Sequence, residues 1–250
     1  MLPAFSIVIP CYNEAGRIGE TLRQTLDYLR NESPESELIV VNDGSTDATP
    51  QIAREVLATA ETQTRLLENY PNRGKGAAVR SGLLAAQRPI GLFSDADLST
   101  PLSETPKVIE TIANGDVDLA FGSRALDRSL IGIHQPWRRE YAGRVFNLLV
   151  RVATGLPFWD TQCGFKAFRL EACRPILEAA RVNGFAFDVE VLFLARRAGL
   201  RVREIPVRWN HAEGSKVDFL RDSLRMLREV VALRFSRWGE TLSSRRTLDH

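Results

Sequence analysis

The chain has 250 residues, of which 44% are hydrophobic and 26% are charged. This composition is ordinary for a globular protein and excludes disordered and collagen-like chains. Its three cysteines show no C-x-x-C spacing, so neither a disulfide framework nor a zinc ribbon is indicated, and a cytoplasmic location fits best. Residues 1–125 contain 11 basic and 17 acidic side chains, whereas residues 126–250 contain 22 and 14.

This charge distribution admits several partners. The basic half could face a membrane, a phosphorylated substrate or nucleic acid, or it could simply be a solvated surface. Nucleic acid is disfavoured because the basic half contains no recognisable recognition element with interleaved aromatic residues. The chain has no run of 18 apolar residues and does not begin like a signal peptide, so we expect a soluble or peripheral protein.

The first 125 residues alternate short apolar runs with helical patterns. Strands are predicted over residues 5–9, 38–41, 65–67, 90–93 and 117–121. Helices are predicted over residues 17–30, 49–60, 76–86 and 103–113. Such alternation indicates an α/β fold in which helices flank a parallel sheet.

Beyond residue 125 the pattern changes. We expect a helix over 137–154, an irregular stretch over 159–168, two helices that end near Gly184 and Gly199, and a strand over 202–209. Last comes a long amphipathic helix whose predicted apolar stripe is Leu220, Leu224, Leu227, Val231, Phe235 and Trp238.

Polar residues follow four of the predicted strands, at residues 10–14, 42–45, 94–97 and 122–124. In open parallel sheets, ligands bind beyond the carboxyl ends of the strands. Any one of these segments could be an ordinary turn. Their coincidence predicts a binding site along this edge.

The pattern Asp-x-Asp occurs twice, which is close to the chance expectation, so only position separates the two occurrences. Asp95 and Asp97 follow a predicted strand, whereas Asp116 and Asp118 lie at the start of the next one. Two carboxylates beside a diphosphate suit Mg²⁺ or Mn²⁺. We therefore expect Asp95 and Asp97 to be metal ligands.

Residues 72–76 precede a predicted helix and contain Gly74, Lys75 and Gly76. They match neither a Walker motif nor a dinucleotide fingerprint. Lys75 could hold an anion at the helix N-terminus, or it could be a solvated lysine.

The ordered segments Ser6 to Glu14, Val41 to Asp47, Asn72 to Gly76 and Asp95 to Leu98 resemble the inverting family-2 glycosyltransferases of the GT-A fold. The segments Asp160 to Lys166, Phe187 to Glu190 and Glu213 to Val217 are similar to dolichyl-phosphate β-glucosyltransferases, and less closely to dolichyl-phosphate mannosyltransferases. The resemblance implies a GT-A, Rossmann-like sheet over residues 1–216, with a nucleotide-binding half (1–125) and an acceptor half (126–216). A basic amphipathic helix and tail (217–250) would follow.

The resemblance also implies roles for individual residues. The base and ribose pocket would be lined by Pro10, Tyr12, Glu14, Val41 and Asp43. Ribose, metal and diphosphate would be held by Asp95, Ala96 and Asp97. Arg124 and Lys216 would meet phosphates, while Gln162, Asp188 and Glu190 would face the sugar and the attacking group. The chain departs from many members at Asn42, where they have a second acid, and from the mannosyltransferases at Ser99, where they have glutamine.

The activity implied is metal-dependent transfer of glucose from UDP-glucose to a polyprenyl phosphate with inversion. The alternatives are GDP-mannose as donor, a soluble acceptor, or a nucleotide-sugar-binding module without turnover. A phosphate monoester is largely dianionic at neutral pH and needs positioning more than a base. Asp188 could therefore be a base or merely cap the helix that begins there.

A lipid acceptor would give the basic final helix a purpose at the membrane surface, on the cytoplasmic face. The helix could lie among anionic headgroups, or it could pack on its own domain or on a dimer partner. The oligomeric state does not follow from the sequence.

Overall fold

The structure is a computed structural model that describes residues 1–133, 137–211 and 219–235. Its strands are β1 (Phe5–Cys11), β2 (Glu37–Asp43), β3 (Gln63–Asn69), β4 (Ile90–Ser94), β5 (Leu119–Ser123), β6 (Ile131–Ile133), β7 (Phe165–Arg169), β8 (Val202–Pro206) and β9 (Trp209–Asn210). Its helices are α1 (Ile18–Glu32), α2 (Thr49–Leu57), α3 (Lys75–Ala85), α4 (Thr105–Ala113), α5 (Trp137–Thr154), α6 (Leu170–Ala179), α7 (Phe187–Arg197) and α8 (Phe219–Phe235).

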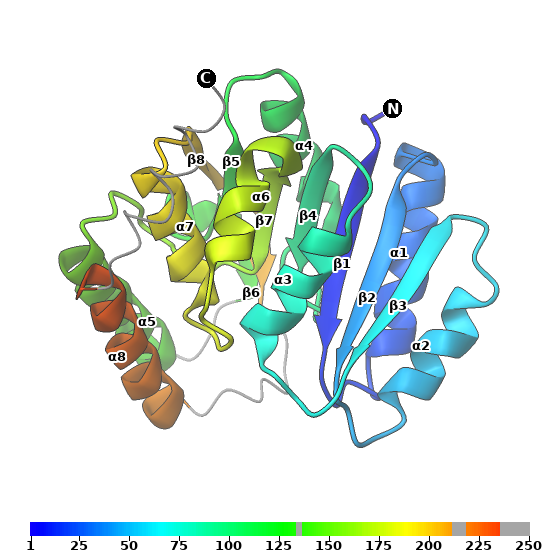
Figure 1. The fold of residues 1–250 in the computed structure, drawn as a ribbon, viewed down its shortest axis with the longest axis horizontal. Helices are drawn as coiled ribbons and strands as arrows, with labels where there is room; N and C mark the ends of the chain where they lie inside the picture. The colour runs from blue at the N-terminus through cyan, green and yellow to red at the C-terminus, as the bar shows by residue number, and fades with distance from the viewer. Residues whose placement is uncertain (134–136, 212–218, 236–250) are drawn as a thin grey trace.

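Seven strands form one twisted sheet in the order β3-β2-β1-β4-β7-β5-β8 (Figure 1). Strands β1 to β4 pair in parallel, and β8 pairs in parallel with β5. Strand β7 runs antiparallel to both of its neighbours, β4 and β5. The expectation of an irregular stretch over 159–168 was therefore wrong for its last four residues, which form a central strand.

Two further elements differ from the sequence expectations. The helix expected to end near Gly184 ends at Ala179, and the strand expected over 202–209 is divided into β8 and β9. Strand β9 leaves the main sheet and pairs with β6 in a separate two-stranded sheet.

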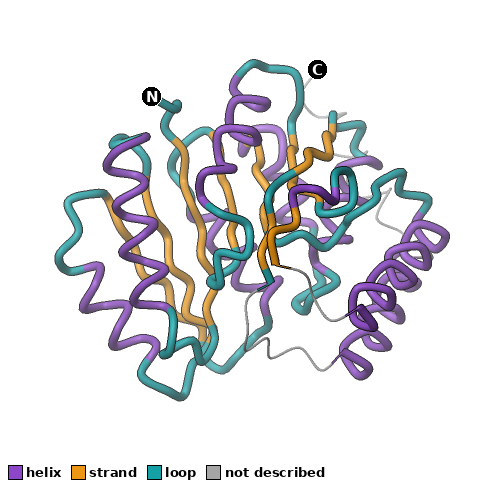
Figure 2. Tube along the Cα trace, turned by 180° about the vertical axis from the view of Figure 1, so that it is seen from behind, coloured by secondary structure: helices purple, strands orange, loops and turns teal. Residues whose placement is uncertain are grey.

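Helices cover both faces of the sheet, as the tube in Figure 2 shows from behind. Val8 and Val41 face a core built with α3, α6 and α7, whereas Ile7 and Ile9 face a second core built with α1, α2 and α4. Every residue of β1, β2 and β4 is consequently buried. This accounts for the continuous apolar runs in the sequence, because a strand covered on both faces needs no polar side.

The final helix, α8, lies beside α5 (Figures 1 and 2). Met226, Val230 and Leu233 are buried in the same core as Phe146 and Val150 of α5. The predicted stripe was thus wrong for Val231, which is 41% exposed. The side chains of Leu220, Leu224, Phe235 and Trp238 lie outside the described residues. Packing of this helix on its own domain is confirmed for the part that is described.

Candidate functional site

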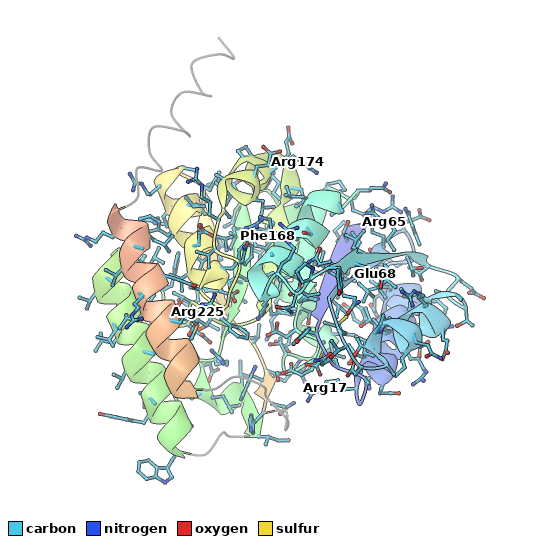
Figure 3. The ribbon with its side chains drawn as sticks, turned by 60° about the horizontal axis from the view of Figure 1, so that its bottom comes forward. Arg17, Arg65, Glu68, Phe168, Arg174 and Arg225 are labelled. Carbon is cyan, nitrogen blue, oxygen red and sulfur yellow. The ribbon has the colours of Figure 1, made fainter. Side chains whose placement is uncertain are left out.

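The four polar segments predicted from the sequence follow β1, β2, β4 and β5 at the carboxyl ends of these strands. This edge lies at the bottom of Figure 1, where the arrow of β1 ends, and Figure 3 brings it forward with Arg17 labelled just before α1. Because β7 is antiparallel, its amino end meets the carboxyl end of β4, and Phe165 pairs with Ser94. Residues 160–164 therefore reach the same edge.

Asp95, Ala96 and Asp97 form a tight turn directly after β4. The backbone N–H of Leu98 donates to the Asp95 carbonyl, and that of Ser99 donates to Oδ1 of Asp97 at 2.9 Å. Thr21 of α1 donates its hydroxyl to the Ala96 carbonyl at 2.6 Å. The turn is thus fixed from both sides, so the two carboxylates have a defined position at the sheet edge.

Four charged side chains alternate in sign across this edge. Nζ of Lys75 lies 2.6 Å from Oδ1 of Asp95 and 3.8 Å from Oδ2 of Asp188. The other oxygen of Asp188 accepts from Nζ of Lys166 at 2.6 Å. Lys166 and Asp188 are 0% and 4% exposed at their side chains, so this ion pair is largely shielded from water. Asp188 lies in this network and does not cap α7: the N-cap residue is Ala186, and none of the described side chains caps the helix.

The site perturbs its ionisable groups in ways that follow from this arrangement. Burial raises the pKa of Asp95, and the nearby carboxylates of Asp97 and Asp188 add to that rise against the opposing effect of Lys75. Burial alone would lower the pKa of Lys75, but the Asp95 and Asp188 carboxylates outweigh it and raise this pKa. An additional cation beside Asp95 would therefore be electrostatically favourable.

The loop before α3 is built around Asp43 at the end of β2. Its carboxylate accepts the Gly74 N–H at 2.7 Å, the Arg73 N–H at 3.1 Å and the Asn69 side-chain amide at 2.8 Å. Gly74 has a φ of 102°, and a side chain there would collide with the carbonyl of Asn183. Asp43 thereby places Lys75 in the first turn of α3. A contact between Asp43 and the base of a nucleotide stays a prediction.

The other residues expected in the base and ribose pocket differ in exposure. Tyr12 is 41% exposed just beyond β1. Glu14 pairs with Arg17 at 2.9 Å, and its backbone N–H donates to Thr49. Pro10 and Val41 are buried within their strands, and the Val41 side chain belongs to the core. The side chain of Val41 therefore points into the core, and its part in a base and ribose pocket stays a prediction.

Arg124 and the expected site residues of the acceptor half lie in different surroundings from one another. Arg124 donates from Nε and Nη2 to the carboxylate of Asp160, at 2.6 and 2.7 Å. Gln162 contacts the sulfur of Met226 in α8 at 3.1 Å. Glu190 accepts the backbone N–H groups of Arg181 and Val182 at 2.9 and 2.8 Å, so its carboxylate fixes the segment before α7. Lys216 lies outside the described residues.

Two residues of the site, Gly164 and Lys166, were not singled out from the sequence. A side chain at Gly164 would collide with the carboxylate of Asp95, and the Gly164 carbonyl accepts the Asp95 N–H at 3.1 Å. Lys166 lies fully buried in β7, with Nζ 5.6 Å from the ring centre of Phe93. A lone lysine within the apolar run 165–168 was the available signal, because such a charge needs a buried partner.

The donor set fits a divalent cation that is shared with a substrate. Asp95 and Asp97 supply hard carboxylate oxygens, the ligands that Mg²⁺ and Mn²⁺ prefer. Among the described residues, no three His, Cys, Asp or Glu side chains form a metal-binding cluster. Diphosphate oxygens and water would complete the coordination, as is usual for Mg²⁺ at phosphate sites.

Comparison with known proteins agrees with this geometry. The model of glycosyl transferase family 2 matches residues 6–177. Dolichyl-phosphate beta-glucosyltransferase of Saccharomyces cerevisiae is 36% identical over 247 residues, which cover 92% of this chain and 74% of the yeast protein. The Drosophila melanogaster protein of the same name is 35% identical, with 91% and 73% covered.

Among solved structures, glucosyl-3-phosphoglycerate synthase from Mycobacterium tuberculosis with Mn²⁺, UDP-glucose and phosphoglyceric acid has a TM-score of 0.69 and 21% identity. The match covers 94% of this chain and 80% of that one. At this identity the likeness supports the fold alone, and it confirms the expected GT-A architecture. In the described part of the chain, no helix has both the length and the apolar character needed to cross a membrane.

Proposed function

The chain belongs to glycosyl transferase family 2 and is a glycosyltransferase, and from this premise we propose that it transfers glucose from UDP-glucose to a polyprenyl phosphate of the dolichyl type, with inversion. The observation that carries the proposal is the acidic turn 95–97, placed beside Lys75 at the carboxyl edge of the sheet. The curated relatives named dolichyl-phosphate beta-glucosyltransferase support the choice of sugar and acceptor.

In this mechanism, Asp95 and Asp97 would hold a divalent metal ion beside the donor diphosphate. A bound Mg²⁺ or Mn²⁺ would neutralise the charge that develops on the departing UDP. Lys75 stands at the first turn of α3, where its ammonium and the helix N-terminus both favour a phosphate. The ammonium would exchange part of its contact with Asp95 for a diphosphate oxygen.

The acceptor needs little help from a base, because its phosphate oxygen is already largely ionised at neutral pH. Asp188 is held by Lys166 and faces Lys75, so it can fix the ammonium groups that orient the reacting phosphates. Arg124 ends the nucleotide-binding half and pairs with Asp160 of the acceptor half, where it would meet phosphate together with Lys216. In-line approach to the anomeric carbon then gives inversion.

The proposal is tested with a panel of UDP- and GDP-sugars, undecaprenyl phosphate or dolichyl phosphate, and Mg²⁺ or Mn²⁺. Glycolipid formed from UDP-glucose, and lost on chelation, is the expected result. Glycolipid formed from GDP-mannose would overturn the donor, and transfer only to a soluble acceptor would overturn the lipid. Binding of UDP-glucose without any turnover would reduce the protein to a nucleotide-sugar-binding module.

A lipid acceptor also requires that the enzyme act at a bilayer surface. We expect that surface to be the cytoplasmic face of a membrane, where nucleotide sugars are available. Fractionation of cells into soluble, peripheral and integral proteins tests whether the association is peripheral, and recovery in the carbonate-washed membrane pellet would contradict that.

A further inference from the structure

The exposed side of helix α5 carries several large apolar side chains, with Arg144 beside them. The exposed side chains are Trp137, Tyr141, Val145, Leu148, Leu149 and Val152, with exposures from 42% to 73%. Their spacing of three, four and seven residues places them on one side of the helix. The opposite side, with Phe146 and Val150, is buried in the core. A helix that is apolar on both sides indicates a partner for its outer face.

The charges around this face are predominantly positive. Helices α5 and α8 together contain eight arginines and three acidic residues. Glu140 and Glu229, the two acidic side chains described on these helices, pair with Arg128 and Arg225. Arg144, Arg228 and Arg234 are exposed on the same two helices. The chemistry of this surface therefore suits a partner that is both apolar and anionic.

Aromatic residues lie near both ends of the apolar face. Trp137 and Tyr141 occupy the first turns of α5, at 73% and 65% exposure, and Trp159 follows the helix at 57%. The guanidinium of Arg151 stacks over Trp159, 4.0 Å from the centre of its ring. Tryptophan and tyrosine are enriched where protein meets lipid headgroups, because their rings are apolar and their N–H or O–H groups are polar.

Helix α5 is also joined directly to the site. Asn147 accepts hydrogen bonds from the backbone and hydroxyl of Thr161, at 3.3 and 3.0 Å, and donates to the carbonyl of Trp159. The segment it holds continues into Asp160, the partner of Arg124, and into Gln162. A surface that holds α5 would thereby fix the acceptor side of the site.

We propose that the exposed face of α5, flanked by the arginines of α5 and α8, docks on the surface of an anionic lipid bilayer. The helix lies in the plane of the headgroups and inserts its apolar side chains. A second copy of this chain is a poorer occupant, because a two-fold contact would bring two arginine-rich faces together. The proposal moves the expected lipid contact from the final helix to α5, with α8 as its support.

Sedimentation with vesicles tests this surface without the acceptor. Vesicles of neutral phosphatidylcholine, and of phosphatidylcholine with phosphatidylglycerol, are made free of polyprenyl phosphate. The full chain should pellet with the anionic vesicles at low salt, and progressively less as salt is raised. Because the vesicles contain no acceptor, this test is independent of glucosyl transfer. Absence of vesicle binding would not contradict the proposed reaction, and absence of glucosyl transfer would not contradict vesicle binding.

Two triple variants locate the contact. Leu148→Glu/Leu149→Glu/Val152→Glu should weaken vesicle binding by about tenfold or more, because three carboxylates replace apolar groups at the interface. Gln24→Glu/Gln51→Glu/Ala58→Glu makes the same change in net charge at exposed positions in α1, in α2 and directly after α2. These helices lie at the other end of the molecule in Figure 1, so this control should bind within about twofold of the unmodified chain.

A third variant, Leu148→Gln/Leu149→Gln/Val152→Gln, separates apolar insertion from charge and should also lose binding. Equal losses in both glutamate variants would overturn the assignment to α5, as would unchanged binding of the α5 variants. A concentration-dependent dimer that only the α5 variants abolish would also overturn it, in favour of a second copy. Circular dichroism and thermal unfolding verify that each variant is folded.

Discussion

The two Asp-x-Asp sequences of this chain have the same pattern but opposite environments. Asp95 follows β4 at the carboxyl edge of the sheet, where burial raises its pKa and Lys75 is its partner. Asp118 precedes β5 at the other edge, where hydrogen bonds from the Arg201 side chain lower its pKa. A substrate phosphate could replace part of the contact between Lys75 and Asp95. Asp118, by contrast, forms a structural ion pair with Arg201.

The difference shows that a carboxylate pair becomes a candidate metal site through its place in the sheet. Asp118 also lies 3.5 Å from Arg169, and Asp116 lies 3.6 Å from Arg203. These arginines compensate both carboxylates at the amino edge. At the carboxyl edge, in the part of the chain that the structure describes, the ammonium of Lys75 faces Asp95 and is shared with Asp188.

The largest expected effect comes from Asp97→Ala, which should lower metal-dependent turnover by about a thousandfold, because the metal and diphosphate lose a ligand. The measurement is kcat for glycolipid formation, with thermal unfolding as a check on the fold. Asp116→Ala is the matched control at the other edge and should retain activity within about twofold. Near-normal turnover of Asp97→Ala would refute the metal assignment.

Two substitutions compare the buried ion pair of Lys166 and Asp188 with the more exposed pair of Arg201 and Asp118. The first is Lys166→Met. It should lower the free energy of unfolding by about 3 kcal/mol, because Asp188 is left as a buried charge without its nearest partner. Arg201→Met, at the 56% exposed partner of Asp118, should lower the free energy of unfolding much less, because water screens an exposed pair.

Urea unfolding measures both variants. The double variant Lys166→Met/Asp188→Leu should recover part of the loss, because no isolated charge is then buried. Equal losses in the free energy of unfolding for Lys166→Met and Arg201→Met would contradict the difference between the buried and the exposed ion pair.

Gly164→Ala should weaken Mn²⁺-dependent UDP binding by about tenfold, because the new methyl group displaces the Asp95 carboxylate. Isothermal titration calorimetry with UDP and Mn²⁺ measures the change. Gly16→Ala is a suitable control, since a side chain there meets nothing within 4 Å. Unchanged affinity of Gly164→Ala would mean that Asp95 does not hold the metal.

The smallest effect concerns pH. Because the pKa of Asp118 is lowered in the folded protein, its ionised form stabilises the fold above the unfolded pKa of about 3.9. That contribution is lost as pH falls through the lowered value. Asp118→Asn should therefore cost about 1 kcal/mol at pH 6 and progressively less below pH 4. Urea unfolding at pH 6 and below pH 4 measures this difference. A loss of stability that becomes larger on acidification would contradict the prediction.

Much of the fold could be predicted from the chain because local patterns specify it. The apolar runs of β1, β2 and β4 are bounded by polar turns, and Pro50 stands in the first turn of α2. Strand β7 could not be predicted, because five residues with a lysine at the second position show neither alternation nor a continuous apolar run. Its pairing partners are far away in sequence, so only the assembled sheet defines it.

Chain order alone places Asp43, Asp95 and Asp97 at one edge, because these residues follow strands and parallel strands end together. Their surroundings, by contrast, depend on contacts that form only in the folded protein. The antiparallel course of β7 brings Gly164 against Asp95 and Lys166 against Asp188. The packing of α5 on α8 and the core likewise decides which apolar side chains of α5 remain exposed. Both outcomes depend on contacts between segments distant in sequence, which local propensity does not encode.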